Sequence, residues 1–468
     1  MYTGGSGPVN GSENDMLMKT FADYAVAERS ARLSDAVVHA AKRTVIDWFS
    51  ALLPGGVVAP ATMLIEAFDE QVGNGRAVLY PSGKRAPAPV AALINGTASH
   101  TVEFDDIFRD AIYHPGCPVI AAALALGQAR KVDGDRFLRA VIVGYEVSTR
   151  IGAVMVPAHY KYWHSTGTVG CFGATAAAAT ILGLDETQFA NAMGTAGTFA
   201  SGLQQAFRSD SMTKPLHAGH AAETGVMAAL AASRGVTGVH DILEGEVGFG
   251  NAMSKDVDWA KAVEGLGSSY NITRMTVKNH GCCGHTFASI DGAQEIQRRQ
   301  GLKPADIKAI KVSTYGTALK VTGNYKHSTP FEGKFSLPYV VASALVHGNV
   351  RLDAFTPERL GCPETGKLMD KIELAIEPKL DASFPKQRAA LVEIATVDGR
   401  SFRHEQTTRR GDPDSPLSDD ELVGKFHELA GSAIGAGTKP LLDAIWKIDT
   451  RADLDLPFGA TPRRDAAE

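Results

Sequence analysis

The stretch from Ser34 to Gly56, SDAVVHAAKRTVIDWFSALLPGG, carries the pattern that decides the fold. From Val38 to Leu52, apolar side chains recur at three- and four-residue steps, so they lie along one face of a helix. Ser34 is a suitable N-cap residue, and the Pro-Gly-Gly at 54–56 is a stop signal. The segment therefore predicts an amphipathic helix with one buried stripe.

Similar patterns continue from Met16 to about residue 270, rich in alanine and short of alternating β-branched runs. Short turns containing Gly, Asp or Pro separate them. This part of the chain predicts an all-helical domain. Its further helices are expected at about 87–101, 118–130, 134–154, 164–183, 186–205, 215–234 and 237–243.

The pattern changes after residue 271. Residues 307–314 and 390–397 alternate between apolar and polar side chains, which predicts two strands. Asp398-Gly399 then predicts a hairpin with a type I′ turn, because both central positions of that turn need positive φ. Helical patterns lie between and before the strands, so this segment predicts an α+β domain. These helices are expected near 286–300, 335–347 and 356–370.

Helices resume near the end of the chain. Ser418 and Glu421 form a capping-box signature, and a second helix is expected at about 439–447. We expect these helices to return to the first domain, which gives a mainly α fold. The expected division is a tail at 1–15, a helical domain at 16–270 and 412–450, an α+β domain at 271–411, and a tail at 451–468.

Composition narrows the functional classes. The 468 residues are 44% hydrophobic and 21% charged, with a net charge of −5, as in an ordinary globular protein. The chain has no surplus of basic residues, so its charge does not favour nucleic-acid binding. The longest apolar run noted, 118–127, is about half of the roughly 20 residues that a membrane-spanning helix needs. Five scattered cysteines and a polar start without a signal-peptide pattern predict a cytoplasmic protein.

The usual signatures of dinucleotide, nucleotide, zinc-protease and serine-hydrolase sites are absent from the sequence. Polar residues instead gather at the edges of very apolar helices. The first such cluster is HTVEFDD at 100–106, followed by YHPG at 113–116. Three carboxylates followed by a histidine before proline favour an active-site loop. An acidic helix end with a capping histidine is the alternative.

Two further clusters open helices. In HSTGTVGCFGA at 164–174, the glycines allow close helix packing, and the unpaired N–H groups at the helix start favour a bound carboxylate or a plain N-cap. In KPLHAGHAA at 214–222, Lys214 suits proton transfer or carboxylate binding, with a solvated surface lysine as the alternative. Arg208, shortly before it, suits a bidentate carboxylate contact or an exposed loop.

The fourth cluster is KNHGCCGH at 278–285, where the helical pattern gives way to the α+β pattern. Substrate pockets are common at domain interfaces. A zinc site is the alternative, but adjacent cysteines do not easily bind one tetrahedral ion together, and the spacing matches no standard site. We therefore expect no metal here.

Together the clusters resemble the MmgE/PrpD family, over about residues 16–450. The resemblance rests on EFDD with its downstream HPG, on H-x-T-G-T-x-G-x-F-G-A, on K-P-x-H-x-G-x-A-A, on LEGEVGFG at 243–250, and on K-x-x-x-C-C-x-x-H. It implies a large helical domain with a smaller α+β lid, a homodimer and no cofactor. It places catalytic residues at His114, His164, Lys214, His285 and Asp106. The substrate-binding positions that we expect are Glu103, Thr168, Arg208 and Lys278.

The resemblance implies chemistry at a carbon next to a carboxylate. Negative charge develops there, so a proton acceptor and fixed positive groups are needed, which several histidines and a lysine supply. A dehydratase of the 2-methylcitrate type, acting on a small di- or tricarboxylate, is the first expectation. An epimerase of an iminodisuccinate-like dicarboxylate and a cis-aconitate-type decarboxylase are the alternatives. A non-catalytic carboxylate-binding protein is the fourth possibility. Such a protein would need no proton donors, so the histidines and the lysine argue against it.

Overall fold

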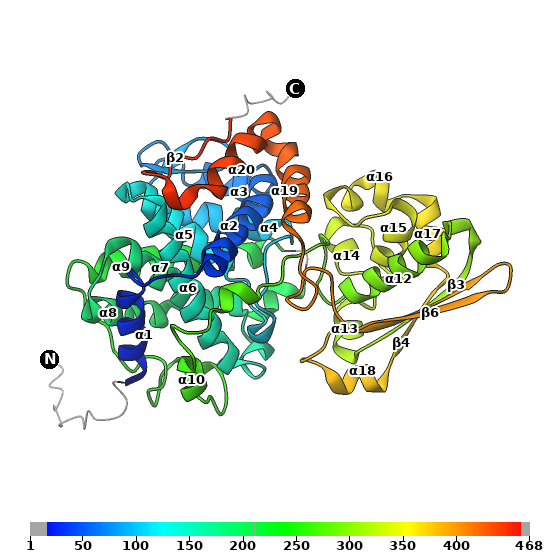
Figure 1. Cartoon of the computed structure of the whole chain (residues 1–468), viewed down its shortest axis with the longest axis horizontal. Helices are drawn as coiled ribbons and strands as arrows, with labels where there is room; N and C mark the ends of the chain where they lie inside the picture. Colours follow the sequence, from blue (N-terminus) through cyan, green and yellow to red (C-terminus); the bar gives the residue numbers. More distant parts are fainter. Residues whose placement is uncertain (1–15, 210, 460–468) are drawn as a thin grey trace.

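A computed structural model of the chain describes residues 16–209 and 211–459. The tail expected at 1–15 and the last part of the one expected at 451–468 lie outside the described residues. The protein is mainly helical, with one small sheet at one end (Figure 1). We call residues 16–276 and 412–459 the helical body, and residues 277–411 the sheet unit.

The helices of the body form largely where the sequence predicts them. Ser34 caps α2 by accepting a hydrogen bond from the amide of Val37 at 3.4 Å. The body holds α1 (Met16–Ala27), α2 (Asp35–Gly55), α3 (Ala61–Ala67), α4 (Ala88–Thr101), α5 (Gly116–Arg130), α6 (Gly134–Met155), α7 (Ser165–Leu182), α8 (Glu186–Phe199), α9 (Thr213–Ala232), α10 (Phe249–Met253) and α11 (Ala260–Val263), with a short hairpin of β1 (Ala77–Val78) and β2 (Arg85–Ala86).

Two helix predictions in the body need correction. The helix expected at 186–205 ends at Phe199, because Ala200 adopts an extended backbone with a ψ of 113°, and the φ of 143° at Gly202 prevents the helix from resuming there. The helix expected at 237–243 does not form. There the chain runs tightly over α8, and the Asn191 side chain accepts a hydrogen bond from the Gly238 amide at 3.2 Å. A Cβ on Gly238 would lie 2.4 Å from the Asn191 carbonyl oxygen, so this close approach replaces helical pairing.

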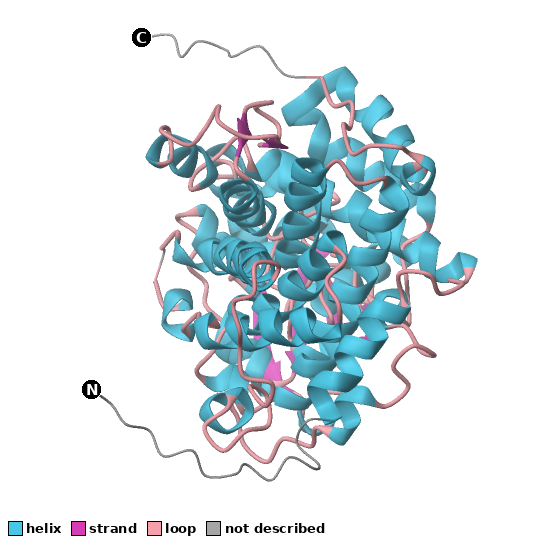
Figure 2. Ribbon diagram, turned by 90° about the vertical axis from the view of Figure 1, so that its left-hand side faces the viewer, coloured by secondary structure: helices cyan, strands magenta, loops and turns pink. Residues whose placement is uncertain are grey.

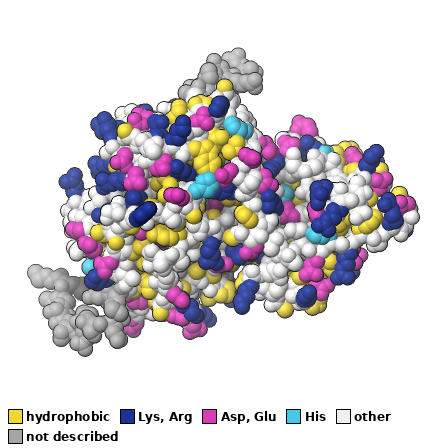
Figure 3. All heavy atoms as spheres, viewed as in Figure 1, with side chains coloured by type: hydrophobic (Ala, Val, Ile, Leu, Met, Phe, Trp, Pro, Cys, Tyr) yellow, Lys and Arg dark blue, Asp and Glu magenta, His cyan; other side chains and the backbone are white. Residues whose placement is uncertain are grey.

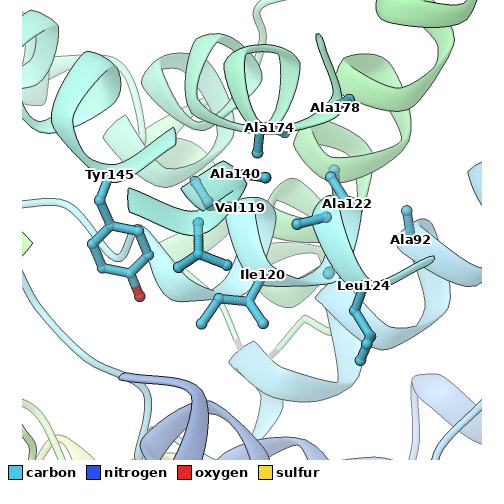
Figure 4. Close-up of a cluster of buried hydrophobic side chains, with 14 of the residues drawn as sticks. Ala92, Val119, Ile120, Ala122, Leu124, Ala140, Tyr145, Ala174 and Ala178 are labelled. Carbon is cyan, nitrogen blue, oxygen red and sulfur yellow. The ribbon is translucent and has the colours of Figure 1, made fainter. Parts of the chain in front are cut away.

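Helix α7 lies in the centre of the body, against α5, α6, α8 and α9. Gly170 allows this approach, since a Cβ there would lie 2.9 Å from Pro118 on α5 and 3.2 Å from Ala221 on α9. Figure 4 shows the small side chains between these helices, among them Ala174 and Ala122. Among the described residues, α7 is long and apolar enough to cross a membrane, but 94% of it is buried inside the protein, as in a core helix. Figure 2 shows the body end-on, with helices crossing in several directions.

The sheet unit contains four strands in the order β4-β3-β5-β6. Strands β3 (Ile307–Thr314), β5 (Ala390–Thr396) and β6 (Ser401–Gln406) are antiparallel neighbours, and β4 (Ile372–Ile376), which the sequence analysis did not identify, pairs in parallel with β3. The unit has its own hydrophobic core, separate from that of the body. Its helices are α12 (Phe287–Gln300), α13 (Gly316–Thr322), α14 (Pro330–Lys334), α15 (Leu337–His347), α16 (Pro357–Leu360), α17 (Pro363–Met369) and α18 (Pro378–Ser383).

Two local predictions fail in this unit. The hairpin between β5 and β6 forms, but only Gly399 has positive φ, at 87°, so the turn is not the expected type I′. The helix expected at 356–370 is divided into α16 and α17 at Gly361 and Cys362. Pro363 follows that break, and a proline disfavours helical geometry in the residue before it.

The C-terminal helices α19 (Asp419–Ile434) and α20 (Thr438–Trp446) pack against α2 in the body (Figure 1). The expected capping box opens α19, with the Glu421 amide donating to Ser418 Oγ at 3.2 Å and the Ser418 amide donating to Glu421 Oε2 at 2.6 Å. The segment that enters the sheet unit at residue 277 and the segment that leaves it at residue 411 run side by side, because the Val277 amide donates to the Gly411 carbonyl at 2.9 Å. On the face in Figure 3, acidic and basic side chains are interspersed.

Candidate active site

The segment between α4 and α5, residues 102–115, is called the acidic loop here. Glu103, two residues after α4 ends, has a φ of 64° in the left-handed region. A side chain with a Cβ pays about 1–2 kcal/mol for that conformation, and such strain is typical of functional sites. The loop is held from behind, because buried Lys425 of α19 donates to the Phe104 carbonyl at 2.9 Å and to Asp47 Oδ1 on α2 at 2.6 Å.

Asp105 joins two imidazoles. Its Oδ2 lies 2.7 Å from Nδ1 of His100, and it accepts a hydrogen bond from the Cys117 thiol at 3.2 Å. Nδ1 of His114 lies 2.8 Å from the same oxygen, as an ion-pair contact rather than an aligned hydrogen bond. Burial would raise the pKa of Asp105, but the two imidazoles and the Lys278 ammonium outweigh it and hold that pKa well below its usual value. A carboxylate in this position favours the proton on Nδ1 and leaves Nε2 as the basic nitrogen.

Burial keeps the His114 ring neutral. It lowers the pKa of His114 to about 4, although the Asp105 carboxylate acts in the opposite direction. At neutral pH this imidazole is therefore unprotonated at one nitrogen and able to accept a proton. His100 packs edge-on against it, with ring centroids 5.0 Å apart.

Glu103 bridges two lysines from distant parts of the chain. Lys214, at the start of α9, forms an ion pair with its Oε1, and Lys278 from the sheet unit lies 3.2 Å from its Oε2. Burial alone would raise the pKa of Glu103, but the two ammonium groups outweigh it and hold that pKa below its usual value. Lys278 also lies 3.6 Å from Asp105 Oδ1, so the lysines and the imidazoles form one cluster.

His164 completes this cluster at the N-terminus of α7. Its ring stacks on that of His100 with centroids 5.4 Å apart, and its Nδ1 lies 3.1 Å from Nδ1 of His217 on α9. Burial lowers the pKa of His164 well below its usual value and that of His217 to about 4. His217 also lines a cavity of about 610 Å³ formed by residues from the 201–220 segment. The buried cluster therefore meets a cavity at His217.

Asp106 points away from the imidazoles. Its carboxyl accepts hydrogen bonds from Tyr145 Oη at 2.8 Å and from the Gly116 amide at 3.0 Å. Burial, followed by the nearby Asp47 carboxylate, raises the pKa of Asp106 to about 8. These contacts hold the acidic loop against α5 and α6, and the catalytic role expected for Asp106 stays a prediction.

His285 belongs to a neighbouring cluster in the sheet unit. Its Nδ1 lies 2.7 Å from Tyr315 Oη, and Tyr315 stacks on Phe384 with ring centroids 4.7 Å apart. Burial, then the charges of Arg388 and Arg409, lowers the pKa of His285 to about 3.

The cluster described above is called the Asp105 group; it consists of His100, Glu103, Asp105, His114, His164, Lys214, His217 and Lys278. No direct contact between His285 and the Asp105 group is found among the described residues. Burial raises the pKa of Tyr160; the Glu103 carboxylate adds to that rise and the Arg388 charge opposes it.

The structure thus brings together five of the nine residues expected at the site, namely Glu103, His114, His164, Lys214 and Lys278. Thr168 lies one turn into α7, where its hydroxyl contacts His159 Nε2 at 2.7 Å and donates to the His164 carbonyl at 3.2 Å. Both contacts of the Thr168 hydroxyl are therefore with groups of the protein itself. Arg208 is exposed and forms no side-chain hydrogen bond or ion pair with any described residue.

Three residues of the cluster were not singled out as site residues from the sequence. His100 and Asp105 lie in the quoted HTVEFDD motif, and His217 lies in KPLHAGH, so the motifs identified the segments but not these side chains. The five-residue spacing from His100 to Asp105 gave no periodic signal, because a helix end and the left-handed Glu103 lie between them.

One group in the described structure has donors close enough for a metal ion: His100, Asp105 and Cys117, whose donor atoms lie within 4.8 Å of one another. Burial raises the pKa of the Cys117 thiol well above its usual value, so the sulfur stays protonated and donates to Asp105. The Lys278 ammonium beside Asp105 also disfavours a cation there. All five cysteines are free, and Cys282 contacts the Thr286 hydroxyl at 3.2 Å.

Comparison with known proteins places this site in a family. Residues 19–262 match the MmgE/PrpD N-terminal domain, and residues 280–447 match the MmgE/PrpD C-terminal domain. The chain is 28% identical to the cis-aconitate decarboxylase of Homo sapiens, over 92% of this chain and 91% of the relative. It is 27% identical to the cis-aconitate decarboxylase-like protein oryM of Aspergillus oryzae, over 89% and 91%, and 26% identical to the cis-aconitate decarboxylase of Mus musculus, over 93% and 91%. The chain belongs to the MmgE/PrpD family.

Proposed function

We propose that the protein is a lyase that acts on a small di- or tricarboxylate by proton transfer at a carbon next to a carboxylate. The observation that carries the proposal is the buried group in which Asp105 joins two imidazoles beside a lysine–glutamate–lysine bridge. Such a group offers proton acceptors and positive charge in one place, which carbon-acid chemistry requires.

His114 is the proposed proton-transfer residue. Its side chain is 16% exposed, whereas that of His100 is fully buried, so the His114 ring is the accessible member of the pair. Asp105 would stabilise the imidazolium that forms when His114 takes a proton, as a carboxylate behind a catalytic histidine does elsewhere.

Lys214 is the proposed carboxylate ligand. Its side chain is 15% exposed against 2% for Lys278, so Lys214 is the ammonium that a bound anion reaches first. A substrate carboxylate would share Lys214 with Glu103, while Lys278 keeps Glu103 and Asp105 ionised. The positive charge then stabilises the carbanion as it develops next to the carboxylate.

Decarboxylation of a cis-aconitate-like tricarboxylate is the first candidate reaction. It is supported by the relatives, which are named cis-aconitate decarboxylase or cis-aconitate decarboxylase-like protein. Each of them aligns with this chain over about nine-tenths of both chains. In this reaction one carboxylate leaves as CO₂, its bonding electrons pass into the carbon framework, and carbon takes a proton. The His114 imidazole, which is neutral at rest, would take that proton up from solvent and pass it to carbon.

Dehydration of a 2-methylcitrate-like substrate is the second candidate. It needs a base for the carbon-bound proton and a separate acid for the departing hydroxyl. The His285–Tyr315 pair favours it, because it is a second hydrogen-bonded proton carrier next to the first cluster. Epimerisation of an iminodisuccinate-like dicarboxylate needs only removal and return of one proton.

One screen separates these reactions. The protein is incubated in D₂O with cis-aconitate, 2-methylcitrate, citrate and iminodisuccinate, and the mixtures are followed by NMR, ultraviolet absorbance and CO₂ release. Released CO₂ supports decarboxylation, and a new conjugated alkene without CO₂ supports dehydration. Deuterium in recovered substrate without either product supports epimerisation. Binding without any exchange or product would contradict the proposal and leave a carboxylate-binding protein.

Single replacements then test the roles. His114→Gln, Lys214→Gln and His285→Gln should each lower turnover by about a hundredfold or more if the residue transfers a proton or stabilises charge. His404→Gln is the control, because His404 lies on β6, away from the cluster, and its Nε2 contacts the Gln406 side chain at 3.0 Å. Near-normal turnover in all three variants would refute the assignment.

We further propose that the sheet unit acts as a lid, since it contributes Lys278 to the cluster and also carries the His285–Tyr315 pair. A homodimer remains a proposal that rests on the family resemblance, and analytical ultracentrifugation tests it. A cytoplasmic location also remains a proposal, supported by the free state of all five cysteines.

A further inference from the structure

A second cavity lies where the sheet unit meets the helical body. It has a volume of about 480 Å³ and is lined by the 382–388 segment and Thr407 and Thr408 from the sheet unit. The body side consists of Arg109 from the acidic loop and of Asp412 and Asp414 from the returning segment. None of the residues that form the Asp105 group lines it.

Arg388 is the unusual residue of this cavity. It is only 9% exposed, and its buried Nε has no hydrogen-bond partner among the described residues. Its one hydrogen bond to a described residue runs from Nη2 to the Arg109 carbonyl at 3.4 Å. A guanidinium offers five donors, and a buried charge is costly unless a counter-charge or hydrogen bonds satisfy it.

The acidic residues at the cavity do not supply that counter-charge. Asp412 accepts two hydrogen bonds from Arg409, at 2.9 and 2.7 Å, and a third from the Thr276 hydroxyl at 2.6 Å. Asp414 forms an ion pair with Arg109 at 2.6 Å. The positive charge of Arg388 is therefore left without a carboxylate partner.

The charges of the Asp105 group balance by contrast. Glu103 and Asp105 contribute two negative charges, and Lys214 and Lys278 contribute two positive ones. A polycarboxylate brings two or three negative charges to this region. Among the described residues, and apart from Lys334, whose pKa burial lowers, Arg388 is the buried cation without a carboxylate partner that is left to meet these charges.

Arg388 is also connected to His285. Phe384 lines the cavity and stacks on Tyr315, whose hydroxyl lies 2.7 Å from His285 Nδ1. After burial, the Arg388 charge is the largest influence that lowers the pKa of His285. An anion on Arg388 would offset that influence.

We infer that this cavity is a carboxylate-binding site in which the Arg388 guanidinium holds one carboxylate group of a small polycarboxylate. The free Nε and its neighbouring N–H form the planar fork that carboxylates bind in two places at once. The choice of a carboxylate as the anion rests on the proposed function. The carboxylate comes either from the far end of the substrate or from a separate molecule.

The binding test uses tricarballylate, a saturated tricarboxylate, titrated calorimetrically into the full-length protein. Arg388→Gln should weaken binding by about tenfold or more, as expected for loss of a charged bidentate contact. Arg388→Lys should recover part of the loss. Arg403→Gln, an exposed arginine on β6, is the matched control and should bind as the wild type does. Circular dichroism checks that each variant is folded, and equal affinity in folded Arg388→Gln and wild type would overturn the inference.

Two further arms identify the source of the carboxylate. If it belongs to the substrate, Arg388→Gln raises KM for the tricarboxylate but not for the analogue in which the far carboxylate is a methyl ester. If it belongs to a separate molecule, tricarballylate still binds in Lys214→Gln and loses that binding in the double variant with Arg388→Gln. Both results support the site. If the wild type turns over the substrate and Arg388→Gln changes neither the KM in the first arm nor the tricarballylate binding in the second, the proposed carboxylate site is overturned. Arg388-dependent binding without turnover of any substrate leaves the site intact and contradicts the proposed function alone.

Discussion

Replacing Asp105 with asparagine removes the charge that joins the two imidazoles and keeps the shape of the side chain. The carboxylate lies 2.7 Å from His100 Nδ1 and 2.8 Å from His114 Nδ1. Contacts of this kind to a charged group are worth about 1.5–3 kcal/mol each. Only the His114 contact strengthens as that ring becomes an imidazolium, so its loss from the transition state costs about 1.5–3 kcal/mol and lowers kcat by about 10–10²-fold.

The pH dependence supplies a second readout for Asp105→Asn. In the wild type, burial lowers the pKa of His114 to about 4, and the Asp105 carboxylate opposes that effect. Without the carboxylate the pKa falls further, so the limb of the kcat profile that reports His114 moves to lower pH. Steady-state rates on the substrate found in the D₂O screen, measured from pH 4 to 9, check the rate, and histidine NMR titration checks the pKa.

Asp110→Asn is the matched control. Asp110 lies on the same loop, but its side chain is 43% exposed and pairs with Arg274 at 2.9 Å on the surface. Exposed ion pairs contribute little, so this variant should retain normal turnover. If Asp105→Asn kept a third or more of the wild-type kcat with no shift of the limb that reports His114, the role given to Asp105 would be wrong.

Three further changes test the packing around the site. Lys425→Met leaves the buried Asp47 carboxylate unpaired and should lower the free energy of unfolding in urea by about 3–5 kcal/mol; a loss below about 1 kcal/mol would contradict this. Asp106 has a pKa of about 8 in the folded protein, above its ordinary value, so the folded state binds more protons than the unfolded state. Its contribution to stability should therefore be lost as pH rises from about 4 to about 8, and the stability difference from Asp106→Asn should change over that range; a constant difference would refute the assignment. Gly167→Ala places a Cβ 2.6 Å from the Ser201 carbonyl oxygen and 3.0 Å from His217 Cβ, so it should displace His217 and lower turnover while circular dichroism stays unchanged; normal kcat would show that this contact is unimportant.

The regular parts of the fold were predictable where local patterns agree with packing. The α2 helix has a cap, a stripe and a stop within one segment, and the structure places it accordingly. Strand β4 was missed because Ile372–Ile376 is short and lies at the edge of the sheet, with only Ile372 fully buried. The 237–243 segment was misjudged because its conformation depends on contacts with α8, more than 40 residues away in sequence.

The site was predictable to the level of segments. The motif EFDD pointed to the loop that carries the carboxylates of the candidate site, but the surroundings of Asp105 and Asp106 depend on backbone geometry at Glu103, which breaks any simple periodicity. Asp106 contacts α5 and α6, whereas Asp105 contacts the imidazoles, and which of the two takes part in the chemistry stays a prediction. Arg388 had no signal at all, because its isolation becomes visible only when the residues around it are seen to pair with one another.

The hydrogen bond from Lys425 to the Phe104 carbonyl has a consequence for biosynthesis. The ribosome makes the acidic loop early and Lys425 more than 300 residues later, so a nascent chain contains the reacting side chains long before it contains the group that fixes them. Catalytic competence should therefore arise only after the last helices emerge and dock. A premature stop anywhere before Lys425 would leave a chain with most of its histidines in place and no assembled reaction centre.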